Sequence, residues 1–112
     1  MPLPALGAAI RVSVVGPASL SSEQIRSYAE YRMFSSLVVL APDVQQVDMV
    51  VTAARDGSDA VCRITVDLGA SGRVRARVRR PGAVRAIDAA AEAVTRAATR
   101  RASRTPKLEA VR

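Results

Sequence analysis

The sequence contains no histidine and only one cysteine, so two common sources of catalytic and metal-binding groups are absent. Without histidine there is neither an imidazole base nor an imidazole ligand for a metal. A single thiol, Cys62, can form neither an internal disulfide nor a multi-thiolate site. The carboxylates are scattered along the chain, and no glycine motif of the phosphate-cradling kind occurs. The sequence therefore predicts a protein that is not an enzyme, with no catalytic residues, metal, cofactor or small-molecule substrate.

Aromatic residues are also scarce: tryptophan is absent, and Tyr28, Tyr31 and Phe34 all fall on one predicted helix. A surface that stacks single-stranded bases needs aromatic side chains, so a nucleic-acid partner would be recognised through its backbone and shape. The apolar start of the chain is too short to span a bilayer. Cys62 lies in an alternating apolar run, as a small buried residue does. We expect a cytoplasmic protein with no membrane partner.

Positive charge is concentrated in the last third of the chain. From Arg73 onward there are twelve basic and three acidic residues, a net charge of +9, whereas the first 72 residues hold five arginines and seven acids, a net charge of −2. A segregated positive field attracts polyanions, and phosphate backbones are the obvious candidates because each neutralised phosphate releases counterions. We expect these C-terminal arginines to be directed together at one folded polyanion.

The chain has the pattern of one domain with a strand, a helix, three strands and a second helix. Apolar–polar alternation predicts strands around residues 10–14, 47–52, 62–68 and 74–78. Apolar residues at three- and four-residue steps predict helices over about 22–40 and 83–101. The expected fold is α+β in the order β-α-β-β-β-α, with a mainly antiparallel four-stranded sheet and both helices on one face. We expect residues 1–8 to be a flexible arm, 9–101 the domain and 102–112 a flexible basic tail.

The same periodicities predict which side chains lie between the helices and the sheet. On the first helix these are Ile25, Ala29, Met33, Leu37 and Leu40, and on the second Val84, Ile87, Ala91, Val94 and Ala98. The opposite face of the sheet is expected to carry Arg11, Ser13, Asp48, Thr52, Arg63, Thr65, Asp67, Arg73, Arg75, Arg77 and Arg79.

Three strings of the sequence, in this order and spacing, carry a resemblance to a known family. They are residues 20–32 (Leu-Ser-Ser-Glu-Gln-Ile-Arg-Ser-Tyr-Ala-Glu-Tyr-Arg), 61–66 (Val-Cys-Arg-Ile-Thr-Val) and 86–91 (Ala-Ile-Asp-Ala-Ala-Ala). Together they resemble the ribosome hibernation-promoting factor and ribosome-associated inhibitor family, in a divergent short form, over about residues 9–104. The resemblance implies a fold related to double-stranded-RNA-binding domains. It also implies binding to the ribosomal RNA of the small ribosomal subunit, in the messenger and transfer RNA channel, which silences translation.

The resemblance further implies RNA-contacting arginines on both helices. By motif position these are Arg26, Arg32, Arg96 and Arg100, and Arg101 and Arg104 extend the row by proximity. The chain departs from the family pattern at Gly82, Val84 and Arg85 before and in the second helix, and at Ser35 and Ser36 in the first. We interpret Asp88, near the start of the second helix, as complementing the helix dipole.

Two features of the sequence allow more than one interpretation. Four arginines alternate along the last strand, where they either contact phosphates or form the solvated face of an edge strand: Arg73, Arg75, Arg77 and Arg79. Tyr31 and Phe34 either pack on the second helix or form a patch for a protein partner. The alternative function is accordingly a small α+β protein–protein interaction module, or a weak homodimer, without ribosome binding. General nucleic-acid binding without ribosome specificity is a third hypothesis.

Overall fold

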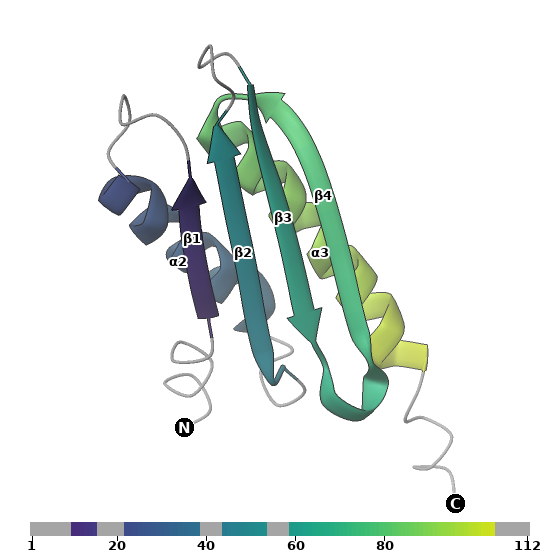
Figure 1. Ribbon diagram of the computed structural model, residues 1–112. Helices are drawn as coiled ribbons and strands as arrows, with labels where there is room; N and C mark the ends of the chain where they lie inside the picture. The colour runs from purple at the N-terminus through teal and green to yellow at the C-terminus, as the bar shows by residue number, and fades with distance from the viewer. Residues whose placement is uncertain (1–9, 16–21, 39–43, 54–58, 105–112) are drawn as a thin grey trace, which may run out of the picture.

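The computed structural model describes residues 10–15, 22–38, 44–53 and 59–104 (Figure 1). Its elements are β1 (Ile10–Val15), α2 (Ser22–Leu37), β2 (Gln46–Ala53), β3 (Asp59–Asp67), the short 3₁₀ turn η2 (Gly69–Ser71), β4 (Arg73–Pro81) and α3 (Ala83–Arg104). The strands form one sheet in the order β1-β2-β3-β4, with β1 parallel to β2 and the other two pairs antiparallel. The predicted α+β fold and element order are confirmed. The sheet is mixed because α2 is the crossover that parallel neighbours require.

Both helices lie on the same face of the sheet, as the alternation predicts. α2 packs behind β1, α3 packs behind β3 and β4, and the two helices contact each other. The buried strand residues are Val47, Met49, Val51, Ala60, Cys62, Ile64, Val66 and Val74. They recur at every second position because successive side chains of a strand point to opposite faces. The other face of the sheet is therefore left open to solvent.

The helices contribute their sheet-facing residues largely as predicted. On α2, Ala29, Met33 and Leu37 are fully buried, Ile25 is partly buried, and Leu40 lies outside the described residues. On α3, the buried residues are Ala83, Ala86, Ile87, Ala90, Ala91, Val94 and Ala98. The prediction for Val84 is wrong: its side chain is 51% exposed, because it lies in the first turn at the edge of the buried stripe. Neither helix, in the part of the chain described, is long and apolar enough to cross a membrane.

The helix ends differ from the predicted ones by a few residues. α2 ends at Leu37, and α3 continues to Arg104, so the first three residues of the expected tail are helical. Alanine and arginine are both good helix formers, which explains the longer α3. The expected arm at 1–8 and the rest of the tail at 105–112 lie outside the described residues.

The turn between β3 and β4 depends on a glycine. The Leu68 amide donates to the carbonyl oxygen of Gly72 at 2.7 Å, and the Gly69 amide donates to the Asp67 carboxylate at 2.9 Å. Gly72 has φ +93°, and a Cβ there would lie 2.9 Å from Nη1 of Arg101. The backbone conformation therefore favours glycine, whereas the guanidinium of Arg101, at the end of a flexible side chain, can shift away from a Cβ. The turn brings β4 back alongside β3 and fixes which of its side chains face solvent.

Candidate nucleic-acid interface

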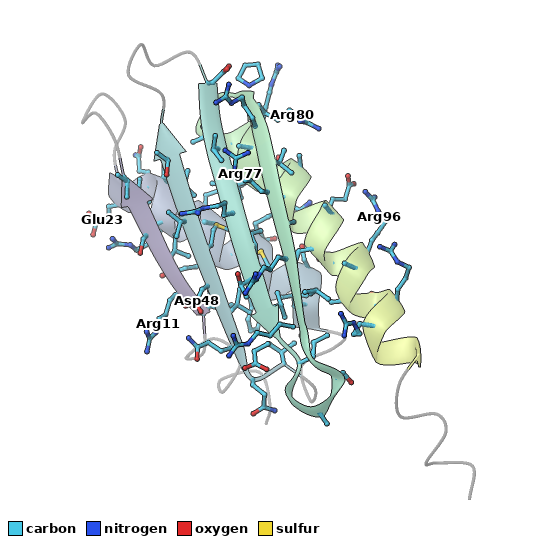
Figure 2. The ribbon with its side chains drawn as sticks, turned by 45° about the vertical axis from the view of Figure 1, so that its right-hand side comes forward. Arg11, Glu23, Asp48, Arg77, Arg80 and Arg96 are labelled. Carbon is cyan, nitrogen blue, oxygen red and sulfur yellow. The ribbon has the colours of Figure 1, made fainter. Side chains whose placement is uncertain are left out.

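The outer side of α3 carries three exposed arginines: Arg85, Arg96 and Arg100. A helix turns by about 100° per residue, so Arg96 and Arg100 lie about 40° apart around the axis, and Arg85 lies about 20° from Arg96. Figure 2 shows Arg96 projecting outward from α3. Glu92 lies one turn before Arg96 at 3.9 Å, but the two side chains are 65% and 68% exposed, so the pairing is weak. We call these three arginines the α3 arginine face.

Arg85 was not among the predicted RNA contacts, although the signal for it is present in the sequence. It precedes Arg96 by eleven residues, and eleven residues are about three helical turns. Arg80, at the end of β4, was also missed. It borders the same surface hollow as Arg32, Arg85 and Asp88, which extends the positive region to the start of α3.

Arg101 does not join the α3 arginine face, although it follows Arg100 directly. Its position is about 140° from Arg96 around the helix. Its guanidinium is turned toward the β3–β4 turn, where Nη1 donates to the carbonyl oxygen of Ser71 at 3.3 Å. Arg104 is the last residue of α3, and its side chain lies outside the described part of the structure.

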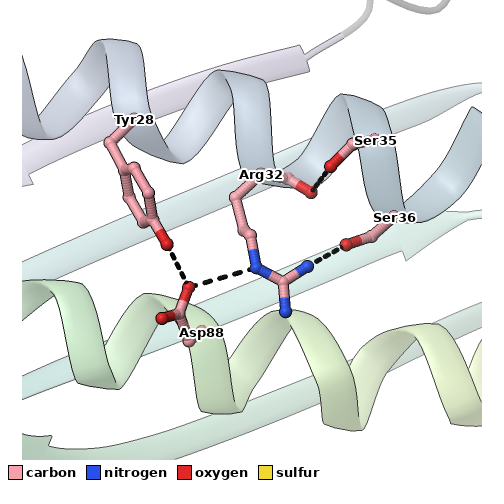
Figure 3. A network of polar contacts seen from close by, with 5 residues as sticks. All are labelled: Tyr28, Arg32, Ser35, Ser36 and Asp88. Carbon is pink, nitrogen blue, oxygen red and sulfur yellow. Dashed lines mark hydrogen bonds and ion pairs between the residues drawn. The ribbon is translucent and has the colours of Figure 1, made fainter.

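The two predicted arginines of α2 point in different directions. They are six residues apart, which places them about 120° from each other around the helix. Arg26 is exposed. Arg32 instead points toward α3, where its Nε donates to Oδ1 of Asp88 at 3.1 Å and its Nη1 donates to the hydroxyl of Ser36 (Figure 3). Arg26 is therefore available at the surface, whereas Arg32 is engaged between the helices.

Asp88 joins the two helices, a role that the sequence did not indicate. Its Oδ1 accepts hydrogen bonds from the Tyr28 hydroxyl and from Arg32 (Figure 3). The hydrogen bond to this carboxylate, together with partial burial, raises the pKa of Tyr28 above its ordinary value. The dipole interpretation of Asp88 is wrong, since the first turn of α3 holds no acidic residue. The Tyr28–Asp88–Arg32–Ser36 network instead fixes how α2 lies against α3.

Four of the five arginines of β4 lie on the open face of the sheet, whereas Arg80 stands opposite the buried Ala60 on the helical side. Along β3 these four stand opposite the following partners: Arg73 faces Asp67, Arg75 faces Thr65, Arg77 faces Arg63, and Arg79 faces Val61. Nε of Arg73 lies 3.8 Å from Oδ2 of Asp67. Among the described residues, no carboxylate pairs with Arg75, Arg77 or Arg79. β4 is an edge strand, as one of the two interpretations requires.

The arginines of the last third therefore form two surfaces rather than one. The α3 arginine face lies on the helical side of the sheet, and the four alternating arginines of β4 lie on the open side, as Arg96 and Arg77 illustrate in Figure 2. The expectation that all of them are directed together is wrong. β4 and α3 are consecutive in the chain, but Gly82, at φ +89°, reverses the chain between them and carries α3 behind the sheet. The separation follows from the strand alternation, which placed the four alternating β4 arginines on the face opposite both helices.

The remaining reactive side chain is inert in this fold. Cys62 is fully buried, and its desolvation raises the pKa of the thiol to about 12. Within the described ranges, no three acidic or cysteine side chains are grouped closely enough to hold a metal ion. The surface chemistry of the domain is thus the chemistry of its guanidinium groups.

Comparisons with known proteins identify related structures. No family model and none of the curated proteins compared matches the sequence. Among solved structures, the Protein Y N-terminal domain of Thermus thermophilus matches with a TM-score of 0.64 and 25% identity, over 81% of this chain and 96% of that one. The resemblance to the ribosome hibernation-promoting factor family is confirmed. A ribosomal subunit interface protein from Coxiella burnetii matches with a TM-score of 0.66 over 83% of this chain and 98% of that one. At 9% identity, this second match shows a shared fold alone.

The arginines that the hibernation-factor resemblance implied as RNA contacts fall into two groups in the structure. Arg26, Arg96 and Arg100 are exposed, and the last two share a face of α3. Arg32 and Arg101 donate hydrogen bonds to other parts of the fold. Contact with RNA stays a prediction for all of the implied residues.

Proposed function

We propose that this chain is a non-catalytic RNA-binding protein of the ribosome that occupies the messenger and transfer RNA channel of the small subunit and silences translation. The observation that carries the proposal is its likeness to the Protein Y N-terminal domain and to the ribosomal subunit interface protein, of which it covers 96% and 98%. Its place of action would be the cytoplasm, where ribosomes work.

The α3 arginine face is the surface that we assign to ribosomal RNA. Guanidinium groups contact phosphates through paired N–H donors, and Arg85, Arg96 and Arg100 are exposed along about four turns of one helix. The weak pairing of Arg96 with Glu92 is readily exchanged for a phosphate. Arg26 is the remaining candidate contact on α2, while Arg32 would position that helix through Asp88. The body of the domain would then block the channel sterically.

Co-sedimentation with small subunits stripped of messenger RNA tests this assignment. Arg96→Gln combined with Arg100→Gln should weaken binding and reduce the magnitude of the slope of log affinity against log salt by about two, one for each lost phosphate contact. Arg75→Gln combined with Arg77→Gln is the matched control, because it removes the same charge from the open sheet. The control should lose less binding and less of the salt slope than the helix variant. Equal losses in both variants would show that charge alone, and not the α3 face, governs ribosome binding.

Occupancy of the channel needs a separate measurement. Small subunits saturated with the protein should no longer retain a labelled messenger oligonucleotide or transfer RNA on a filter, and translation in a purified system should stop. Subunits that carry the protein and still bind both RNAs at unchanged affinity would contradict the channel assignment while leaving ribosome binding intact.

The protein–protein alternative is less well supported by the surface. The exposed large apolar residues among those described are Val15, Tyr31 and Val84, and they belong to three different elements. Phe34 packs against the core, so it does not form a patch with Tyr31. Gel filtration over a wide concentration range distinguishes a homodimer from a monomer.

A further inference from the structure

The open face of the sheet is a second strongly basic surface, on the side away from α3. By the strand register it carries six arginines and three aspartates: Arg11, Arg63, Arg73, Arg75, Arg77 and Arg79 against Asp48, Asp59 and Asp67. Asp48 accepts hydrogen bonds from the amide of Gln46 at 3.1 and 3.2 Å, and Asp67 pairs with Arg73. Among the described residues, no carboxylate pairs with the four other arginines of β3 and β4 on this face, which are Arg63, Arg75, Arg77 and Arg79.

One cross-strand pair on this face is unfavourable in the free protein. Arg63 of β3 and Arg77 of β4 stand directly opposite each other, and both are exposed. Like charges at opposite positions of neighbouring strands destabilise a sheet. Together with Arg75 they border a hollow whose lining also includes Asp48, Val50 and Thr65, and the Asp48 carboxylate accepts hydrogen bonds from the Gln46 amide. An anion in this hollow would lie between guanidinium groups and relieve their repulsion.

The spacing of the arginines along β4 indicates an extended anion. Side chains two residues apart on a strand are separated by about 6.8 Å, so the row from Arg73 to Arg79 spans roughly 20 Å. A nucleic-acid strand rises about 3.4 Å per stacked nucleotide, so roughly six nucleotides match this length. All three aromatic residues of the chain belong to α2, behind the sheet, so the open face offers no platform for base stacking. Recognition there would involve phosphates and not bases.

We propose that the open face of the sheet is a second binding surface, which holds the phosphate backbone of a single RNA strand along β4. It would bind without preference for sequence, and simultaneously with contacts of the α3 arginine face. A second copy of this chain is a poor occupant, because two such faces carry the same excess of positive charge. The proposal stands on the open face alone and does not depend on ribosome binding.

Fluorescence anisotropy of a labelled six-nucleotide oligouridine, without ribosomes, tests the proposal. Replacing Arg75 and Arg77 together by Gln should reduce the magnitude of the salt slope by about 1.4, or about 0.7 for each phosphate on a single strand. The affinity advantage of the original chain over this variant should then shrink about sevenfold between about 50 and 200 mM salt. Arg75→Lys combined with Arg77→Lys should restore most of the slope, because it restores the charge.

Two controls make the result specific. Replacing Arg96 and Arg100 together by Gln removes the same charge from the other basic surface, so for this single strand the sheet variant should lose more of the slope than the helix variant. Equal or larger loss in this helix variant would overturn the proposal in favour of general charge attraction. A hexaglutamate peptide that displaced the oligonucleotide at equal concentration would overturn it in favour of an acidic protein partner. The sheet variant should melt no lower than the original chain, since it removes the Arg63–Arg77 repulsion; a lower melting temperature would instead indicate a structural role.

Discussion

Replacing Asp88 by alanine should loosen the packing of α2 against α3. The substitution removes the acceptor of two hydrogen bonds, from Tyr28 and from Arg32. A net hydrogen bond contributes about 0.5–1.5 kcal/mol, and one to a buried charge more. The Arg32 and Asp88 side chains are 27% and 44% exposed, so solvent screening reduces the ionic part. We expect a loss of about 1–2 kcal/mol in the free energy of unfolding, or roughly 4–8 °C in Tm for a domain of this size.

Urea unfolding of a double-mutant cycle measures whether the contact itself is responsible. Tyr28→Phe removes only the hydroxyl and keeps the ring, so it is the matched partner for Asp88→Ala. The double variant should lose about 0.5–1 kcal/mol less free energy of unfolding than the sum of the two single variants, because each single change already removes the same hydrogen bond. Simple additivity would refute the reasoning. The cycle of Arg32→Gln with Asp88→Ala tests the second hydrogen bond in the same way.

The same network predicts a loss of stability at high pH. The folded protein holds the pKa of Tyr28 above its ordinary value of 10.0, so above pH 10 the unfolded chain releases this proton more readily than the folded one. Stability is therefore fully present below pH 10 and declines as pH rises through the folded pKa. Asp88→Ala should reduce the Tyr28 contribution to this decline, since the largest cause of the raised pKa is the hydrogen bond to Asp88, although partial burial also raises it. An unchanged decline in the variant would contradict the assignment.

Three further predictions concern the rest of the fold. Cys62, fully buried and with a pKa of about 12, should not react with thiol reagents at neutral pH until urea unfolds the chain; a stoichiometric reaction in the native protein would show that the site is open. Gly72→Ala and Gly82→Ala should each cost about 1–3 kcal/mol, because both glycines have a positive φ, and an unchanged Tm in either variant would contradict this. Met33→Ala should cost about 2–5 kcal/mol in urea unfolding, against less than about 0.5 for the exposed Tyr31→Ala.

The order of elements and most of the core could be predicted because each depends on local periodicity. Alternation placed Cys62, Ile64 and Val66 on the buried side of β3, and the three- and four-residue steps placed Met33 and Leu37 toward the sheet. The burial prediction was wrong at the margin of the apolar stripe of a helix. Val84 fits the apolar spacing of α3, yet it lies in the first turn and stays half exposed.

The candidate site was predicted less completely, because it depends on contacts between distant segments. Arg96 and Arg100 are four residues apart on one helix, so helix geometry alone places them together. Arg32 and Asp88 are 56 residues apart, and no periodicity in either helix indicates that they meet. Only the packed structure shows that Arg32 is bound to Asp88 and is not free to contact RNA as Arg96 and Arg100 are.

By itself, the sequence determined the kind of chemistry available to this protein: guanidinium groups in excess, no histidine, one buried thiol and no aromatic platform outside α2. It also determined the strand and helix pattern, since side-chain periodicity is a local property. Only the tertiary structure decided which arginines are engaged inside the fold. Arg32 meets Asp88 of the other helix, and Arg101 meets the carbonyl oxygen of Ser71 in the β3–β4 turn, because packing joins segments that lie far apart in the chain.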